Sequence, residues 1–367
     1  MNFDFGENEK AFREKIKGLF DQEARSDLDR MENGDINQIR EGLLDWLKRL
    51  GKVDYLAFGL DEGANSLALL AAQEMLASIS PSLFLGVEVT AGIFGRLVAA
   101  YGTPDQKEEI LPALKEGLLI GTIALTEGGL IAEPSGGGYR ISGSADHVVN
   151  APVADWIAVG GEAGGNGVYV LIKKGSEGLS IGQRLFSLGY NGTATAPISL
   201  DNSPVSSKYI IGPFMGREPL EKAGLWEDRV LTAASLGLMQ RCYLTALNHA
   251  KTQQRGGKPL IADQEFGFKL AEMLTLVQTA QLLAYRAAWM AETGDKEAAI
   301  LAHCAKVFCA ESAEKVASQA IQILGKQGFF HSNPAQEGYR YAKYIQVAGT
   351  STEMSRMKIG EGLLEWK

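Results

Sequence analysis

Two adjacent carboxylates, Glu227 and Asp228, precede Arg229 at the start of a long segment with helical periodicity. A carboxylate beside a substrate can act as a general base when the two heavy atoms that share the proton come within about 2.6–3.2 Å. Acidic residues are also favoured in the first turn of a helix, where the backbone dipole is positive. These residue types leave two interpretations open, a catalytic base or a pair of helix-opening acids.

The cysteines and histidines do not suggest a metal site. The three cysteines, Cys242, Cys304 and Cys309, lack the spacing of a metal-binding motif. We expect them to be small buried side chains in a reducing compartment. The four histidines are too few and too scattered for a metal cage. No metal is therefore predicted.

Glycine clusters occur at 128–129, 136–138 and 160–165, and such clusters can cradle a phosphate. A nucleotide-binding cradle, however, follows a strand and opens a helix. None of these clusters has that context. We therefore interpret them as turns between strands.

The elements that must position these side chains change type twice along the chain. Helical periodicity dominates to residue 119, short runs rich in Val, Ile and Tyr follow, and helical periodicity returns near residue 217. Because no helical segment interrupts the middle runs, they predict a mainly antiparallel sheet. The predicted fold class is α+β multidomain, with an N-terminal α-helical domain at 1–119, a middle antiparallel β domain at 120–216 and a C-terminal four-helix bundle at 217–367.

The bundle helices are predicted near 225–254, 264–292, 296–324 and 350–364. Long helices joined by short loops are typical of an antiparallel bundle. The stretch AILAHCAKVFCA at 298–309 is apolar enough to suit either the core of the bundle or an interface with another subunit.

Composition limits the possible partners. The 367 residues are 46% hydrophobic and 22% charged, which excludes global disorder. Acidic residues outnumber basic ones 44 to 36, and the net charge of −8 argues against broad nucleic-acid binding. The charged N-terminus is unlike a signal peptide, and no uncharged apolar stretch approaches the roughly 20 residues of a membrane helix. We expect a soluble, cytoplasmic protein with no nucleic-acid or membrane partner.

Six short motifs occur in an order that resembles the acyl-CoA dehydrogenase family over nearly the whole chain. They are GTPDQK at 102–107 with the following Leu111-Pro112, ALTE at 124–127, LDNSPV at 200–205, GKPLIADQEFGFKLAEM at 257–273, AIQILGKQGF at 320–329 and AGTSTEM at 348–354. Each motif is weak alone, but chance does not readily produce six in this order.

The resemblance implies an FAD-dependent oxidoreductase acting on CH–CH groups. Family members remove the α proton of an acyl thioester with a carboxylate, while N5 of FAD takes the β hydrogen as hydride. The implied substrate is an acyl-CoA or an acyl-carrier-protein thioester, because both carriers present the same phosphopantetheine arm. The implied partners are an electron-transfer flavoprotein or similar acceptor, and further copies of the chain in a homodimer or homotetramer.

The base of this family is usually a Glu just before the C-terminal Gly-Thr. Here residues 346–350 read Gln-Val-Ala-Gly-Thr, without a carboxylate. A branch that includes isovaleryl-CoA dehydrogenase carries the Glu at the start of the first bundle helix, in Leu-Asp-Leu-Glu-Arg. Residues 225–229 read Leu-Trp-Glu-Asp-Arg. The resemblance thus implies Asp228 as the base, Glu227 as the fallback and Arg229 as a residue near the acyl substrate.

The flavin-binding motifs depart further from the family. The Pro-x-Ala-Gly-Ser-Asp loop is replaced by GGLIAEPSGGGY at 128–139, and the Trp-Ile-Thr element by His-Val-Val at 147–149. An imidazole in place of the indole is more often a packing substitute than an acid–base group. Residues 253–257 retain an arginine, Arg255, but it stands two positions after the place where the family carries its arginine. The cofactor-binding positions implied by the resemblance are Leu125, Thr126, His147, Val149, Gln253, Arg255, Gln264, Gln322, Gly325 and Thr350.

Three functions remain open. The first is an FAD-dependent acyl-thioester dehydrogenase with Asp228 as base. The second is a low-activity or non-catalytic subunit of a heteromeric acyl-CoA dehydrogenase, completed by a related second subunit. The third is a flavin-free family member that acts as a binding or scaffold protein. A flavin absorption band separates the first from the third, and co-purification of a similar chain points to the second.

Overall fold

The computed structural model describes residues 6–60, 65–125, 130–216, 218–294, 297–331 and 333–365. Contacts along the backbone divide the chain into two compact units. We call Met1–Arg13, Asn65–Pro81 and Asp228–Lys367 the bundle unit, and Glu14–Ala64 and Ser82–Glu227 the sheet unit. This division differs from the three predicted sequence segments, because the helix at 66–79 groups with the C-terminal helices.

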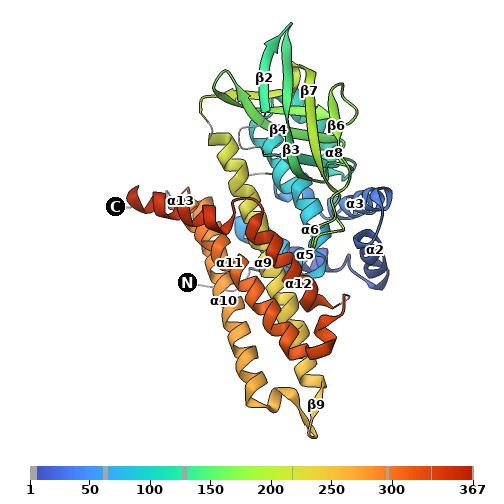
Figure 1. Ribbon diagram of the computed structural model, residues 1–367, viewed down its shortest axis with the longest axis vertical. Helices are drawn as coiled ribbons and strands as arrows, with labels where there is room; N and C mark the ends of the chain where they lie inside the picture. The colour runs from blue at the N-terminus through green and yellow to red at the C-terminus, as the bar shows by residue number, and fades with distance from the viewer. Residues whose placement is uncertain are drawn as a thin grey trace. The chain divides into compact units, whose positions relative to one another are not determined.

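The bundle unit is built from long helices that run side by side (Figure 1). Its C-terminal helices are α9 (Glu218–Thr252, whose first ten residues belong to the sheet unit), α10 (Gln264–Glu292), α11 (Ala298–Leu324), α12 (Pro334–Val347) and α13 (Thr352–Glu365). The mostly buried α5 (Ser66–Ile79) joins them, as does the start of α1 (Glu7–Lys17). A small hairpin, β9 (Gln254–Arg255) with β10 (Lys258–Pro259), connects α9 to α10.

Four of the described bundle helices match the predicted ones, but α12 was missed. The sequence predicted helices near 296–324 and 350–364, with no helix between them. In the structure the break after α11 ends at Asn333, whose side chain accepts a hydrogen bond from the Ala335 N–H. Pro334 takes the first helical position, where a missing N–H does no harm. The proline therefore opens α12 instead of interrupting the chain.

The helices of the sheet unit precede its strands. They are α2 (Gln22–Glu32), α3 (Ile36–Gly51), α4 (Tyr55–Phe58), α6 (Pro81–Glu88), α7 (Arg96–Tyr101) and α8 (Pro104–Lys115). A π-helical segment, Val89–Gly95, joins α6 to α7. By length and hydropathy the combined stretch Pro81–Tyr101 could cross a membrane, but 89% of its most apolar window is buried inside the protein. It is therefore a core helix.

Among the described residues, eight strands form one sheet in the order β6–β7–β3–β2–β4–β5–β8, with β1 paired to β4. The strands are β1 (Gly121–Ala124), β2 (Leu130–Ser135), β3 (Gly138–Val149), β4 (Trp156–Ala163), β5 (Asn166–Lys173), β6 (Leu179–Ile181), β7 (Thr195–Ser206) and β8 (Ile210–Phe214). Most neighbours are antiparallel, as predicted. However, β4 pairs in parallel with both β1 and β2, so the sheet is mixed.

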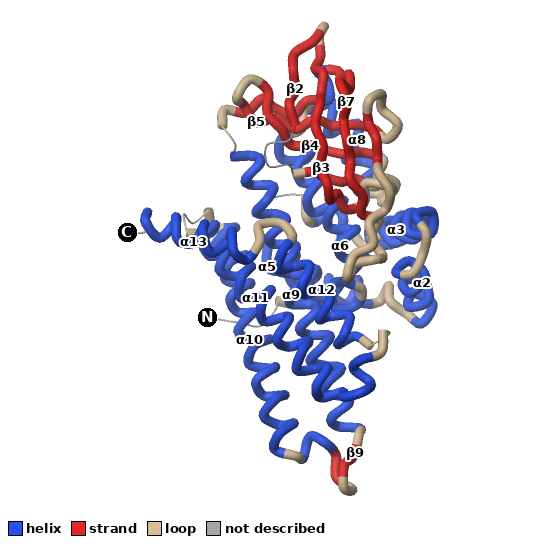
Figure 2. Tube along the Cα trace, viewed as in Figure 1, coloured by secondary structure: helices blue, strands red, loops and turns tan. Residues whose placement is uncertain are grey.

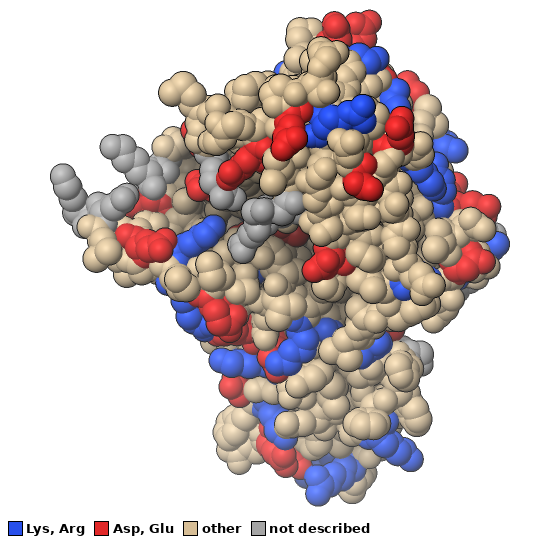
Figure 3. Space-filling model, turned by 45° about the horizontal axis from the view of Figure 1, so that its top comes forward, with Lys and Arg blue, Asp and Glu red and all other residues tan. Residues whose placement is uncertain are grey.

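Two of the three glycine clusters contain a turn, as the sequence indicated. Gly136 and Gly137 join β2 to β3, and Gly164 and Gly165 join β4 to β5, all with positive φ. Gly160 and Gly161, however, lie within β4 and are not part of a turn. The cluster at 128–129 lies outside the described residues. In Figure 2 the strands of the sheet, drawn in red, lie side by side. Acidic and basic side chains are interspersed on the face seen in Figure 3.

Candidate active site

Asp228 lies on α9 and its side chain is 1% exposed. Its Oδ1 accepts a hydrogen bond from the backbone N–H of Thr350 at 2.9 Å. Thr350 stands in the connection between α12 and α13, where the family usually carries its base. The structure therefore brings the Asp228 carboxylate into contact with the 348–350 turn.

The turn itself is shaped by Gly349, which has φ +61°. A side chain there would be strained, because L residues rarely adopt this conformation. On one side of the glycine the carbonyl of Ala348 accepts a hydrogen bond from Lys306 Nζ at 3.0 Å. On the other side the N–H of Thr350 donates to Asp228. Two charged side chains thus hold the two ends of this turn.

Two further residues of α11 face Asp228. Lys306 Nζ lies 3.8 Å from Asp228 Oδ1, and its side chain is 0% exposed. His303 Nδ1 lies 3.7 Å from Asp228 Oδ2. Both belong to AILAHCAKVFCA, in which Ala302, Ala305 and Cys309 are also buried. This face of α11 therefore forms part of the core of the chain, one of the two roles left open by the sequence.

Sequence reasoning missed His303 and Lys306, although a signal was present. The two polar residues are three positions apart in an apolar helical stretch, which puts them on the same face. A buried cation needs a partner of opposite charge. The pairing with Asp228, far away in the sequence, could only be seen in the structure.

Burial lowers the pKa of His303 below its ordinary value. The Asp228 carboxylate pulls this pKa upward, whereas the ammonium groups of Lys358 and Lys306 push it further down. Within the described residues, Asp228 Oδ2 and His303 Nδ1 are buried atoms without a hydrogen-bond partner. The two unpaired atoms lie 3.7 Å apart.

The other residues predicted near the substrate lie on the same helix. Arg229 follows Asp228 on α9 and is half-buried, as is Glu227. Successive residues on a helix point about 100° apart, so the three side chains leave α9 in different directions. Asp228 is the one whose carboxylate contacts the 348–350 turn.

Five of the predicted cofactor residues lie at one end of the bundle. Arg255 lies in strand β9 of the β9–β10 hairpin, Gln253 and Gln264 flank the hairpin, and all three are exposed. Gln322 and Gly325 are exposed at the end of α11, which reaches the same end because α10 and α11 are antiparallel (Figure 1). Thr350 lies at the opposite end of α12, a helix about 21 Å long. The structure thus separates these positions into two groups.

The hairpin end suits part of a nucleotide. Arg255 is 71% exposed and only loosely paired with Asp263, at 3.9 Å. A guanidinium in this state can bind a phosphate. The exposed amides of Gln253, Gln264 and Gln322 supply further donors and acceptors. The chemistry of these side chains therefore fits the adenosine diphosphate portion of FAD.

The remaining cofactor positions lie in the sheet unit. Leu125 directly follows β1, while His147 and Val149 lie at the end of β3. The Thr122 hydroxyl donates to the Val149 carbonyl, so β1 and the end of β3 are neighbours. His147 is exposed, and Val149 is half-buried. Thr126 lies outside the described residues.

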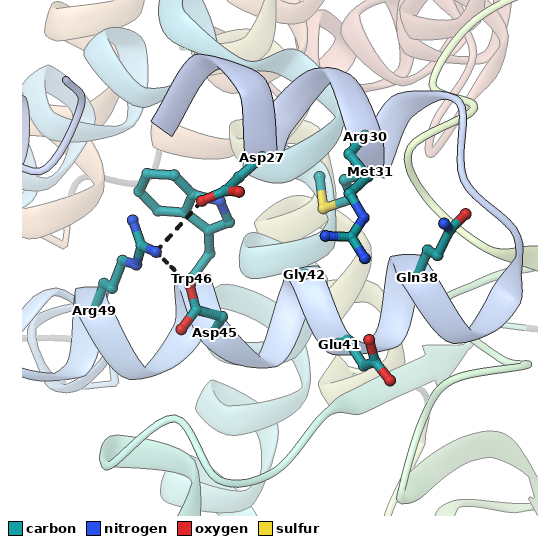
Figure 4. Close-up of a pocket in the computed structure, with 9 residues that line it drawn as sticks. All are labelled: Asp27, Arg30, Met31, Gln38, Glu41, Gly42, Asp45, Trp46 and Arg49. Carbon is teal, nitrogen blue, oxygen red and sulfur yellow. Dashed lines mark hydrogen bonds and ion pairs between the residues drawn. The ribbon is translucent and has the colours of Figure 1, made fainter. Parts of the chain in front are cut away.

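A separate cavity of about 280 Å³ lies between α2 and α3 (Figure 4). Arg49, one of the residues that line it, contacts the carboxylates of Asp27 and Asp45 at 3.4 and 2.7 Å. The same guanidinium lies over the ring of Trp46, which stacks on Phe20. These mutual contacts hold α2 against α3, and none of the predicted site residues takes part.

Comparison with known proteins identifies the family. Residues 6–117 match the family described as acyl-CoA dehydrogenase, N-terminal domain, and residues 220–364 match acyl-CoA dehydrogenase, C-terminal domain. Isovaleryl-CoA dehydrogenase of Oryza sativa is 30% identical, over 80% of this chain and 75% of its own length. The chain belongs to the acyl-CoA dehydrogenase family.

Solved structures show the same fold. Butyryl-CoA dehydrogenase from Megasphaera elsdenii superposes with a TM-score of 0.89 at 22% identity, covering 99% of this chain and 100% of its own. The prolyl acyl carrier protein oxidase AnaB gives 0.85 at 20%, covering 98% and 100%. FAD is the cofactor of this family, and similar folds are known with FADH2 and with FAD. The predicted fold class and family cofactor are confirmed.

Proposed function

We propose that this protein is an FAD-dependent acyl-thioester dehydrogenase in which Asp228 removes the α proton of the substrate. The hydrogen bond between Asp228 Oδ1 and the Thr350 N–H carries this proposal. It places a carboxylate beside the 348–350 turn, where the usual family base is absent. A buried carboxylate so positioned is hard to explain as a helix-opening acid, because it faces away from solvent.

The two oxygens of Asp228 have different surroundings. Oδ1 is held by the Thr350 N–H and lies near the Lys306 ammonium. Oδ2 has no hydrogen-bond partner in the described part of the chain. We assign Oδ2 as the atom that takes the proton from the α carbon. FAD, when bound, supplies the acceptor for the β hydrogen.

Buried contacts hold this base in place. Lys306 Nζ lies 3.8 Å from Oδ1 and gives the carboxylate a partner of opposite charge, because burial of an unpaired charge is costly. The Thr350 N–H fixes the orientation of the carboxylate group. The chain therefore positions the base in a buried site before any substrate arrives.

The substrate we propose is an acyl chain carried as a thioester by CoA or by an acyl carrier protein. AnaB, which is described as a prolyl acyl carrier protein oxidase, shares this fold, and isovaleryl-CoA dehydrogenase is similar in sequence. Electrons would then pass to an electron-transfer flavoprotein or a similar acceptor. We also propose that the protein is cytoplasmic. We propose a homodimer or homotetramer, because Arg255 and its neighbours are exposed and suit a cofactor shared between subunits.

The test is anaerobic bleaching of the flavin by a panel of short, branched and cyclic acyl thioesters on both carriers. Asp228→Asn retains an oxygen for the Thr350 N–H but cannot accept the proton. Bleaching should slow by about 10²–10⁴-fold, the usual contribution of a general base. Asp228→Glu, which restores the residue of the isovaleryl branch, should stay active.

Glu227→Gln is the matched control, because it removes the neighbouring carboxylate and should bleach like the wild type. Flavin content and circular dichroism verify that each variant is folded. If Asp228→Asn bleaches at the wild-type rate, Asp228 is not the base. If the wild type bleaches with no thioester, the heteromeric-subunit and scaffold functions take precedence, and co-purification of a related chain decides between them.

A further inference from the structure

We propose that His303 is a proton relay for Asp228, receiving at Nδ1 the proton that Asp228 Oδ2 takes from the substrate. This inference rests on the proposed dehydrogenase function. His303 acts through Asp228 and is a positioning residue, not a second base. Asp228 must lose its proton in every turnover. Because its side chain is buried, a neighbouring side chain has to accept that proton.

The geometry singles out one pair of atoms. Asp228 Oδ2 and His303 Nδ1 are both buried, both lack a hydrogen-bond partner in the described chain, and lie 3.7 Å apart. Buried polar atoms nearly always have a hydrogen-bond partner, so two unpaired atoms this close together need an explanation. A gap of this size is closed by a small rotation, and catalytic hydrogen bonds are often long before substrate binds.

The charge state of the pair suits a relay. Asp228 on α9, Lys306 on α11 and Lys358 on α13 are the charged groups that act on His303. Burial and the two ammonium groups disfavour the imidazolium, whereas the carboxylate favours it. A neutral imidazole with its proton on Nε2 leaves Nδ1 free to accept. Once formed, the imidazolium gives up its proton readily.

The transfer balances without another reactant. The substrate Cα–H bond breaks and an Oδ2–H bond forms on Asp228. That bond then breaks as Nδ1–H forms on His303, which restores the carboxylate. The imidazolium releases a proton from Nε2, and the neutral imidazole returns to its starting tautomer after proton exchange with water.

The first test measures exchange in D2O. His303→Asn keeps an amide near the position of Nδ1 but cannot carry a proton through. Single-turnover flavin reduction should remain within about threefold of the wild type, because Asp228 still removes the proton. Deuterium incorporation at the α carbon of recovered substrate should fall by about tenfold or more, since the proton stays on Asp228 and returns. The neighbouring Cys304→Ser is the matched control and should change neither rate.

A purely structural role would lower both rates together or leave both unchanged, and either result overturns the relay. Loss of flavin reduction alone would also overturn it. The KM for the thioester should be the same in wild type and His303→Asn, because in this proposal His303 takes its proton from Asp228 and not from the substrate.

The second test needs no activity. The chain has only four histidines, so the His303 ring can be followed by NMR in the full-length protein and assigned with His303→Asn. Asp228→Asn removes the charge that favours the imidazolium, and should lower the pKa of His303 further. An unchanged titration would disprove the coupling of the two groups. If no thioester bleaches the wild-type flavin, the proposed function fails, while this titration still decides whether the pair is coupled.

Discussion

Lys306→Met should destabilise the bundle unit by about 3–4 kcal/mol at pH 7. Lys306 and Asp228 are each at most 1% exposed and their charged atoms are 3.8 Å apart. At this distance an effective dielectric constant of about 20 gives an attraction of about 4 kcal/mol. Removal of one partner of a buried pair typically costs 3–5 kcal/mol, because the other charge stays buried without compensation.

Thermal melts followed by circular dichroism measure the effect. A cooperative unit of 150–250 residues loses about 2–4 °C of Tm per kcal/mol, so the expected drop at pH 7 is about 10 °C. Lys343→Met is the matched control. Lys343 pairs with Glu314 at 2.6 Å, but its side chain is 40% exposed, so less than about 1 kcal/mol should be lost.

A double variant separates the charge from the packing. Lys306→Met with Asp228→Asn removes both charges, and should recover most of the stability lost in Lys306→Met alone. If the double variant is no more stable than Lys306→Met, the loss comes from packing and the electrostatic argument is wrong. A loss in Lys306→Met as small as that in Lys343→Met would refute it as well.

Two further predictions concern α5 in the bundle unit. Burial raises the pKa of Glu74, whose carboxylate accepts hydrogen bonds from Gln281 and Tyr285. The free energy of unfolding of the wild type therefore falls as pH rises through that raised pKa. The Tm of Glu74→Gln minus that of wild type should therefore increase from pH 5 to pH 8, and a constant difference would contradict this. A Cβ on Gly237 would lie 2.6 Å from atoms of α5, so Gly237→Ala should cost about 1–3 kcal/mol. In the control Gly224→Ala, on the same helix, the new Cβ would have no neighbour within 4 Å. If denaturant melts show a similar loss of stability in Gly237→Ala and Gly224→Ala, the close approach to α5 is not the cause.

Local sequence signals were sufficient for most of the fold because each depends on neighbouring residues. Thr103 and Gln106, only three residues apart, form a reciprocal capping box at the start of α8. The glycines at 136–137 and 164–165 adopt the positive φ that such turns require. The miss at α12 came from a local ambiguity, since Pro334 can either end a helix or open one.

The candidate site was less predictable because it depends on pairings between distant segments. The motif around Arg229 located Asp228, and the Gly-Thr motif located Thr350, but only the fold shows that they touch. His303 and Lys306 could not be found by family resemblance, as no motif includes them. Their partner is 75 or more residues away, and no local pattern encodes such a contact.

The contacts of Asp228 give one carboxylate two tasks. The 348–350 turn is held at Ala348 by Lys306 and at Thr350 by Asp228, so the turn, the carboxylate and the ammonium form one buried unit. A buried ammonium needs an anion nearby, and Asp228 supplies one. Electrostatics therefore requires a carboxylate at this point of the fold, and under the proposed function the same carboxylate removes the α proton of the substrate.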